Sequence, residues 1–298
     1  MLTLLIFLMY LGVVLLLAAQ LYFPVYQVLE AYWEIRPDRV FYRLAMLIAI
    51  LGFWPFLTLL GINNRYALGY TLERRQFIQT LLKGLCVGVA IMAVHAGLLL
   101  LSGVRAASPE AFQLGWLSSV LVSGLISGLM VAFIEETFFR GAMQNHLRYG
   151  NPLFTTAIIT SLFYASVHFT RPPAPIPGMV IDWSSGWEML EGMLHQYRSF
   201  GGFVDSFVAL FIAGLLLSLV REKSGNIALC IGIHAGWVMG IRLARELTVA
   251  VPDSPAAGLI GSYDGIIGWA AAVVLGLVTL GYWLYGYKRS GKSSGVVS

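Results

Sequence analysis

Apolar runs of about 20 residues recur from one end of the sequence to the other, and polar breaks separate them. A helix needs about 20 predominantly apolar residues to cross the roughly 30 Å hydrocarbon layer of a bilayer, because each residue rises about 1.5 Å. Of the 298 residues, 58% are hydrophobic and 11% are charged, whereas soluble domains carry about 25% charged residues. The chain is therefore predicted to be an integral-membrane protein.

The runs predict an all-α fold, a polytopic membrane helix bundle of about eight transmembrane helices. No polar stretch is long enough for a separate soluble domain, so residues 1–298 are expected to form a single integral-membrane domain. The predicted helices cover residues 2–24, 40–62, 78–102, 115–139, 152–169, 203–221, 226–243 and 265–286. The fifth and seventh are short, and we expect them to be lightly tilted or partly sunk in the bundle.

Two linkers have distinct compositions. Residues 63–76 are rich in charge and predict an interfacial helix that leads into the third span. The longest loop, residues 170–202, begins with prolines that forbid a regular helix, and its later half has the spacing of an amphipathic interfacial segment. The prolines are Pro172, Pro173, Pro175 and Pro177, and the amphipathic residues are Trp183, Trp187 and Met189.

The net charge is +4 and the isoelectric point is near 9.1, but the basic residues mostly flank the predicted spans. They therefore indicate topology and a lipid bilayer as partner, and no nucleic acid is expected. Placing the amino terminus inside puts eleven of the 19 Lys and Arg residues on the cytoplasmic side and eight outside. We expect a multi-pass protein of a prokaryotic cytoplasmic membrane, with both termini and the mouth of the active site on the cytoplasmic side.

Two adjacent carboxylates, Glu135 and Glu136, lie near the end of the fourth predicted span. Each ionisable side chain inside a membrane costs from about 2.5 kcal/mol upward, so each one needs a partner or a purpose. Glu136 and Arg140 are spaced i and i+4 on one helix face and can neutralise each other. Successive helical residues point about 100° apart, so the two glutamates are not expected to share a partner. Glu135 is expected to face a cation, a metal or a bound water. As an alternative, both are solvated charges at a helix end.

Two histidines lie in later spans. His168 closes the fifth span and His234 lies within the seventh. A lone membrane histidine is more often a hydrogen-bonded core residue, but imidazole and carboxylate together can hold and deprotonate a water. Small neighbours would let the helices approach closely enough to bring these groups together. These small residues are Ala165, Ser166, Gly232, Ala235 and Gly236.

The motifs are similar to those of the CPBP family of intramembrane proteases, which includes type II CAAX prenyl endopeptidases and bacteriocin-processing or self-immunity (Abi-like) proteins. Glu135, Glu136 and Arg140 resemble its Glu-Glu-x-x-x-Arg signature. Tyr164 and His168 resemble its second motif, an aromatic residue four before a histidine, and His234 resembles the histidine of the third. The resemblance covers a catalytic core at residues 115–245.

The resemblance implies an intramembrane endopeptidase that hydrolyses a peptide bond of a membrane-associated protein or peptide. Glu135 would activate water, and His168 and His234 would orient it and stabilise the oxyanion. The supporting residues would be Glu136, Arg140 and Tyr164. The sequence names no particular substrate: prenylated tails, bacteriocin leaders, sorting-signal tails and anchored regulators all remain open.

The third motif departs from the family pattern, because Val238 stands where an Asn usually follows the histidine by four residues. A hydrogen-bond donor near the developing oxyanion is thereby missing, and losing one such donor can cost about 3 to 4 kcal/mol of barrier. This departure favours an alternative, a catalytically weak or inactive scaffold or chaperone of the same fold. A transporter ranks last, because inverted repeats are not evident.

The cofactor is a second open point. Glu135, His168 and His234 could together hold Zn²⁺, because a glutamate with two histidines is a recognised catalytic zinc set with water in the fourth place. The same groups can activate water without a metal, as a glutamic-type peptidase would. We favour the metal-free reading and keep the metallo-endopeptidase as its alternative.

Overall fold

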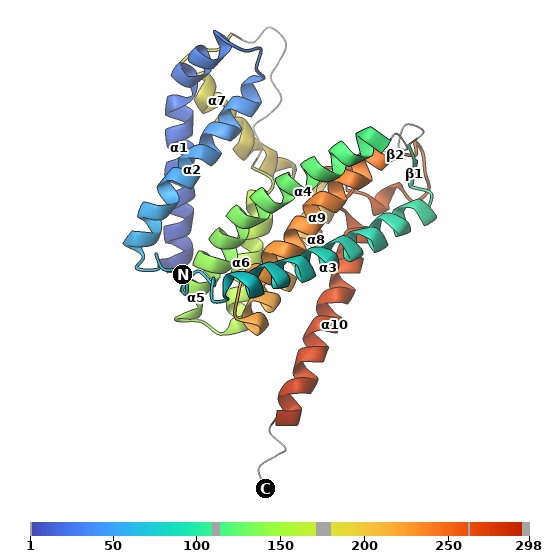
Figure 1. The fold of residues 1–298 in the computed structure, drawn as a ribbon. Coiled ribbons are helices and arrows are strands. Elements are labelled where there is room, and N and C mark those ends of the chain that lie inside the picture. Colours follow the sequence, from blue (N-terminus) through green and yellow to red (C-terminus); the bar gives the residue numbers. More distant parts are fainter. Residues whose placement is uncertain (1, 109–113, 171–179, 262, 294–298) are drawn as a thin grey trace. The chain divides into compact units, whose positions relative to one another are not determined.

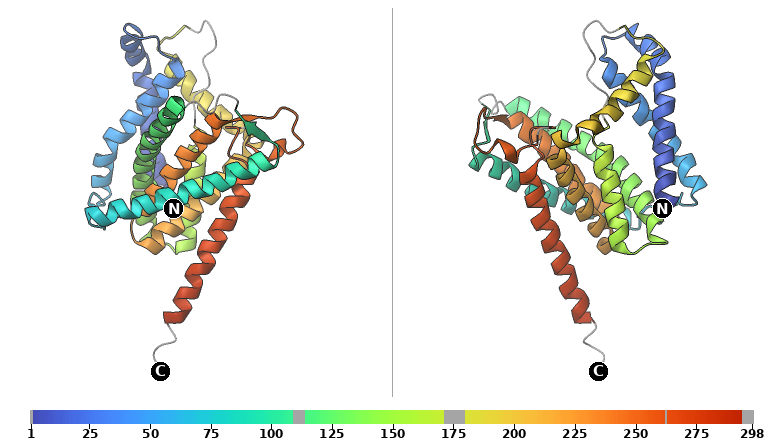
Figure 2. Two further views of the ribbon diagram at one scale, coloured as in Figure 1. Left: turned by 45° about the vertical axis from the view of Figure 1, so that its right-hand side comes forward. Right: turned by 180° about the vertical axis from the view of Figure 1, so that it is seen from behind.

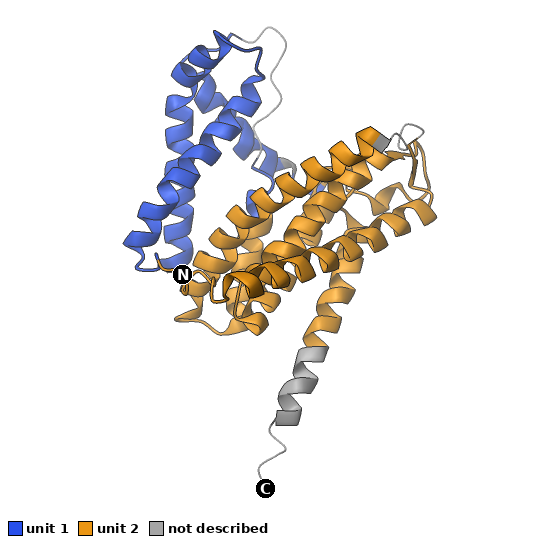
Figure 3. Cartoon of the chain, viewed as in Figure 1, with its two compact units in different colours: residues 1–63, 166–201 blue, residues 64–165, 202–298 orange. Residues whose placement is uncertain are grey.

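The computed structural model describes residues 2–108, 114–170, 180–261 and 263–293. The chain divides into two compact units, which Figure 3 distinguishes by colour. Unit 1 comprises residues 1–63 and 166–201, and unit 2 comprises residues 64–165 and 202–298.

Unit 1 is built from two long helices and one short one (Figure 1). These are α1 (Leu2–Glu30), α2 (Pro37–Leu59) and α7 (Ser185–His195), which is followed by a 3₁₀ segment, η2 (Gln196–Gly202). The predicted amphipathic segment is a helix: Met189 and Met193 of α7 are buried against α1 and α2, while Trp187 is 44% exposed. The four prolines predicted to break this loop lie outside the described residues.

Unit 2 holds the remaining helices and a small sheet (Figures 1 and 2). Its α-helices are α3 (Arg74–Leu101), α4 (Leu114–Glu136), α5 (Gln144–Arg148), α6 (Leu153–Val167, whose last two residues fall in unit 1), α8 (Val204–Ser224), α9 (Ala228–Leu247) and α10 (Trp269–Ser293). A π-helix, η1 (Thr137–Met143), joins α4 to α5, and η3 (Ala257–Leu259) is a 3₁₀ turn. Strands β1 (Arg105–Ala107) and β2 (Thr248–Ala250) pair antiparallel, with Arg105 opposite Ala250.

The predicted fold class, an all-helical membrane bundle, is confirmed. Five helices of the described chain are long and apolar enough to cross a membrane, and α6 and residues 269–284 of α10 are shorter apolar helices. Those five are residues 2–30, 37–59, 74–101, 115–148 and 204–224. The seventh predicted span corresponds to α9, which carries His234 and ends in charged residues. Its first half is buried inside unit 2, where protein rather than lipid surrounds it.

Helix α9 lies in direct backbone contact with α3. Two glycines on each helix face each other at i, i+4 spacing: Gly84 and Gly88 on α3, and Gly232 and Gly236 on α9. A Cβ atom added at Gly232 would stand 2.1 Å from the Leu81 carbonyl oxygen, and one at Gly88 would stand 2.2 Å from the Ile233 carbonyl oxygen. Small residues permit this approach in membranes, where van der Waals packing drives helix association.

Helix α9 approaches α4 in the same way. A Cβ added at Gly128 of α4 would stand 2.7 Å from the Ala235 carbonyl oxygen. The small residues predicted around His234 therefore do hold neighbouring helices close, Gly232 and Gly236 toward α3 and Ala235 toward α4. Because α9 packs on both helices, the position of His234 is fixed relative to the carboxyl end of α4.

The predicted interfacial helix at residues 63–76 is wrong. Residues 63–73 form turns, and α3 begins at Arg74. The chain reverses through Gly69, whose φ of +85° favours glycine. Tyr70 then lies against the π-helix, where its hydroxyl is 2.6 Å from Thr137 Oγ1. Because Thr137 donates to the Phe133 carbonyl, Tyr70 is the donor of this bond. Burial raises the pKa of Tyr70 to about 12, so the phenol keeps its proton at working pH.

Replacing Gly232 by alanine should destabilise unit 2. The added methyl group would overlap the Leu81 carbonyl oxygen, and overpacking of this kind costs typically 1–3 kcal/mol. We expect a clearly lower midpoint of thermal unfolding for purified Gly232→Ala. Gly97→Ala is the matched control, since nothing lies within 4 Å of a Cβ at that position of α3. Equal midpoints for the two variants would contradict the tight α3 to α9 contact.

Candidate active site

A fully buried ion pair lies where α4 passes into the π-helix. Arg140 Nη1 is 3.1 Å from Glu136 Oε1, and both side chains are 0% exposed. The contact expected from the i, i+4 spacing is therefore present. The sequence did not indicate the π-helix that holds Arg140. A π-helical turn bonds i to i+5 and is frequent at functional sites.

A ladder of polar contacts continues from this pair along α5 to α8. Arg140 Nη2 donates to the Gly214 carbonyl at 3.3 Å, Gln144 Nε2 to the Ser218 carbonyl at 3.0 Å, and Arg148 to Glu222 Oε1 at 2.8 Å. Each contact joins residues 74 apart, so the two segments run parallel and in register. The sequence signal for this ladder is a polar residue at every fourth position from Glu136 to Arg148, and sequence reasoning missed it beyond Arg140.

The imidazole of His234 lies between the two glutamates. Its Nδ1 is 2.8 Å from Glu136 Oε1, and its Nε2 is 3.9 Å from Glu135 Oε2. The expectation that adjacent glutamates cannot share a partner is therefore wrong. An imidazole presents two nitrogens on opposite edges, and one carboxylate faces each of them.

The two carboxylates differ in their surroundings. Glu136 is 0% exposed and its Oε1 meets both Arg140 and His234, whereas the Glu135 side chain is 28% exposed. Glu136 is thus enclosed by cationic and imidazole donors. Glu135 is the carboxylate that solvent or a substrate can reach. The reading of both as solvated charges at a helix end does not hold for Glu136.

Tyr164 of α6 covers the buried pair. The Arg140 Cζ atom lies 4.5 Å from the centre of the Tyr164 ring, and that ring meets the His234 ring edge-on with centroids 6.1 Å apart. The phenol is 2% exposed. A guanidinium over an aromatic face is stabilised by the ring quadrupole, so Tyr164 helps to fix Arg140 and His234.

His168 follows α6 directly, one residue beyond its last residue, Val167. It falls in unit 1, whereas Glu135 and His234 lie in unit 2. Its approach to those two residues therefore stays a prediction. Val238 lies one turn beyond His234 on α9 and is partly exposed.

The metal reading can be tested against the donors present. Among the described residues, no group of three His, Cys, Asp or Glu side chains is placed to hold a metal ion. Glu135 and the Nε2 atom of His234 are two donors that face each other. Catalytic zinc takes three protein ligands, so unit 2 by itself falls one ligand short and only His168 would complete the predicted set.

The comparisons with known proteins agree with the motifs. Residues 114–240 match the family described as type II CAAX prenyl endopeptidase Rce1-like, which confirms the resemblance expected from the sequence. A curated relative, an uncharacterized 24.3 kDa protein of Escherichia coli, is 26% identical over 152 residues, 49% of this chain and 56% of the relative. The chain thus matches little more than half the length of that relative. No solved structure matches the chain significantly.

Single substitutions of Glu135 and Glu136 should have different effects on stability, because Glu136 belongs to the buried ion pair and Glu135 does not. Removing one member of a buried ion pair costs about 3–5 kcal/mol, because the other charge is left uncompensated. We therefore expect Glu136→Gln to lower the thermal midpoint and the membrane abundance of the protein strongly. Glu135→Gln, the matched control at the adjacent position, should leave both close to wild type. The reverse order of stabilities would contradict this division.

Proposed function

We propose that the chain is an intramembrane endopeptidase that hydrolyses a peptide bond of a membrane-associated protein or peptide. The observation that carries the proposal is the His234 imidazole held between Glu136 and Glu135. The match of residues 114–240 to a CAAX-type protease family supports a membrane peptidase at the level of the family.

Glu136 sets the tautomer of His234. A carboxylate paired with arginine only accepts hydrogen bonds, so the bond at 2.8 Å requires the proton on Nδ1. In the neutral ring Nε2 is then an acceptor, and it faces Glu135 at 3.9 Å. One water oxygen about 2.8 Å from each atom fits across this separation. Glu136 and Arg140 are thus positioning residues, and they aim Nε2 at the water.

Glu135 acts as the general base in this arrangement. It takes a proton from the water, and the water oxygen forms a bond to the scissile carbonyl carbon. The resulting tetrahedral oxyanion collapses as the carbon–nitrogen bond breaks, and the proton held by Glu135 passes to the leaving amine. The products are one carboxylate and one amine, and Glu135 returns to its starting state.

The oxyanion needs a hydrogen-bond donor, and Nε2 of neutral His234 is not one. We assign this task to His168, in agreement with the role that the sequence motif implies. Val238 cannot supply a donor at the position where the family usually has asparagine. The oxyanion site of this chain therefore rests on fewer side-chain donors, and a slower reaction is expected than with the asparagine present.

Val238 also favours a second candidate function, a non-catalytic scaffold or chaperone of membrane partners. In that case the Glu136–Arg140–His234 contacts would serve stability alone. The two functions differ at Glu135, which is partly exposed. A scaffold has no use for its basicity, whereas a peptidase depends on it.

Glu135→Gln should abolish peptide cleavage and leave the protein in the membrane at normal levels. The test compares membrane-protein fragments from cells that carry wild type, Glu135→Gln, His168→Ala or His234→Ala. Fragments that require all three residues would identify both the activity and its substrates. A wild-type fragment pattern in Glu135→Gln cells, together with an intact cellular phenotype, would favour the scaffold.

A chelator should not reduce cleavage by the purified protein, because the proposed water is held by Glu135 and His234 alone. The measurement pairs the rate before and after chelation with metal analysis of the same sample. If stoichiometric zinc is present and its removal stops cleavage, the Glu135, His168 and His234 set binds metal and the metal-free proposal is wrong. In that case zinc would supply Lewis-acid activation of water.

A further inference from the structure

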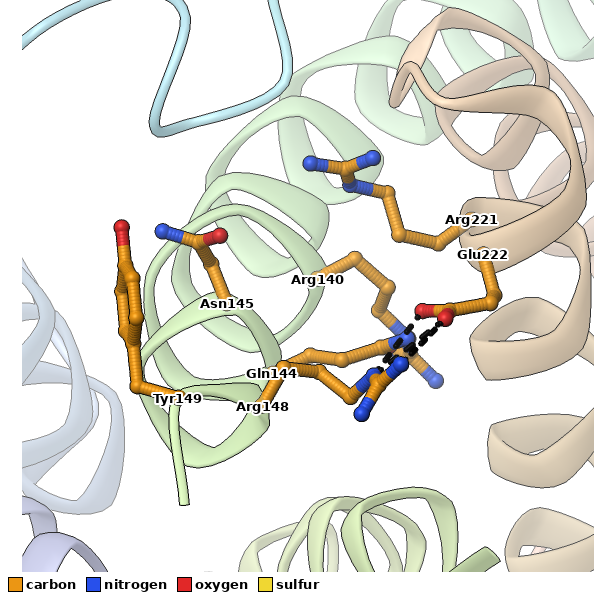
Figure 4. Close-up of a pocket in the computed structure, with 7 residues that line it drawn as sticks. All are labelled: Arg140, Gln144, Asn145, Arg148, Tyr149, Arg221 and Glu222. Atoms are coloured by element: carbon orange, nitrogen blue, oxygen red, sulfur yellow. Dashed lines mark hydrogen bonds and ion pairs between the residues drawn. The ribbon is translucent and has the colours of Figure 1, made fainter. Parts of the chain in front are cut away.

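A polar cavity of about 310 Å³ lies in unit 2 beside the polar ladder, and Figure 4 shows the residues that line it. Two segments line it: the stretch from η1 through α5, and the end of α8. The lining residues are Arg140, Gln144, Asn145, Arg148, Tyr149, Arg221 and Glu222. Its volume equals about ten water molecules at roughly 30 Å³ each, which is room for a phosphate group with part of its substituent.

The lining carries an excess of positive charge, with three arginines against one glutamate. Arg140 is paired with Glu136, and Arg148 is paired with Glu222 at 2.8 Å. The third arginine of the lining, Arg221, forms no ion pair within 4.0 Å among the described residues. Its guanidinium packs on Gly69, where an added Cβ would stand 2.8 Å from Nη2. The side chain of Arg221 is thus held in place, and the nearby Glu222 carboxylate, which pairs with Arg148, acts on it without forming an ion pair.

Buried donors of the lining lack partners among the described residues. They are Arg140 Nε, on a side chain that is 0% exposed, together with Asn145 Nδ2 and Arg221 Nε. Buried polar groups in native proteins are satisfied by protein, water or ligand, so each such atom needs an explanation. The lining also holds one unpartnered acceptor, Gln144 Oε1, but the donors outnumber it and the net charge is positive, which favours acceptor oxygens that carry negative charge. Arginine's planar fork matches phosphate in this way.

The cavity also lies where two membrane spans end. The candidate spans at residues 115–148 and 204–224 finish at α5 and at the end of α8, and Arg148 and Arg221 lie in their last turns. Tyr149, 79% exposed, follows directly. Lipid headgroups lie at this level, and tyrosine is enriched there. A phosphate at this depth would most readily come from a lipid.

We propose that this cavity binds the phosphate group of an anionic phospholipid, held by Arg221, Asn145 and the Nε edge of Arg140. Basic pockets between membrane helices bind such headgroups on the cytoplasmic side. That is also the side on which the Lys and Arg count places these residues. The site shares Arg140 with the proposed peptidase centre, but Arg221 and Asn145 belong to the cavity alone, so the site stands even if the peptidase reaction does not occur.

The experiment titrates the purified full chain, in detergent and phosphate-free buffer, with phosphatidylglycerol, phosphatidylcholine or inorganic phosphate. A ligand that binds the folded state raises the thermal midpoint. We expect phosphatidylglycerol to raise it at low molar ratios and the other two probes to do so at least tenfold less effectively. Equal action of inorganic phosphate would overturn the assignment to lipid, and no effect of any probe would overturn the site.

Two variants test whether the rise of the thermal midpoint comes from binding in the cavity. Arg221→Gln removes the cation of the lining that forms no ion pair among the described residues, and Asn145→Ala removes one unpartnered donor with little change of fold. Each should weaken apparent phosphatidylglycerol affinity, Arg221→Gln by at least tenfold. The control Arg75→Gln removes an equal charge from an exposed position at the start of α3 and should bind like wild type. Equal loss in Arg75→Gln and Arg221→Gln would show general surface attraction and overturn the proposal.

Discussion

One buried oxygen atom organises the centre of unit 2. Glu136 Oε1 meets the guanidinium of Arg140 at 3.1 Å and the imidazole of His234 at 2.8 Å. An unpaired carboxylate at this depth would be strongly unfavourable, and the pair is tolerated only because further hydrogen bonds surround it. Arg140 supplies one of them to the Gly214 carbonyl of α8. The Glu136 carboxylate therefore joins α4, η1, α8 and α9 through the contacts of two side chains.

Backbone contact between helices makes this geometry possible. Glycines at 84, 88, 232 and 236 let the backbones of α3 and α9 touch at these positions, and farther along the seam Gly240 packs on the Met92 side chain. Ala235 lies against Gly128 on the α4 side. A larger residue in either seam would push α9 outward and lengthen the hydrogen bond between His234 and Glu136. The identity of these small residues is thus as important for the site as the charged residues that they bring together.

Arg140 takes part in two neighbouring features of unit 2, the buried ion pair and the polar cavity. The Nη atoms contact Glu136 and the Gly214 carbonyl, and the Arg140 side chain also lines the polar cavity together with Arg221. The parallel ladder from Arg140 to Arg148 explains why so many polar groups tolerate this position near the end of a span. Gln144 and Arg148 are paired across to α8, and Arg140, Asn145 and Arg221 of the cavity lining keep buried donors without a partner among the described residues. The ladder and the basic cavity consequently share residues, because Arg140, Gln144, Arg148 and Glu222 belong to both.

The sequence by itself determined the helical membrane class, most helix ends to within four residues and the pairing of Glu136 with Arg140. Helices α1 and α10 continue to Glu30 and Ser293, six and seven residues beyond their predicted ends. These predictions follow from apolar run length and from i, i+4 spacing, which are properties local to one helix. It also identified His234 as a partner of the glutamates, through its motif. It could not show that Glu136 takes the Nδ1 edge and Glu135 faces Nε2, nor could it predict the π-helix. Those features were decided by the tertiary structure. Helical periodicity fixes the direction of each side chain only relative to the axis of its own helix. The rotation of α9 and its distance from its neighbours depend on contacts with α3 and α4, which are distant in sequence.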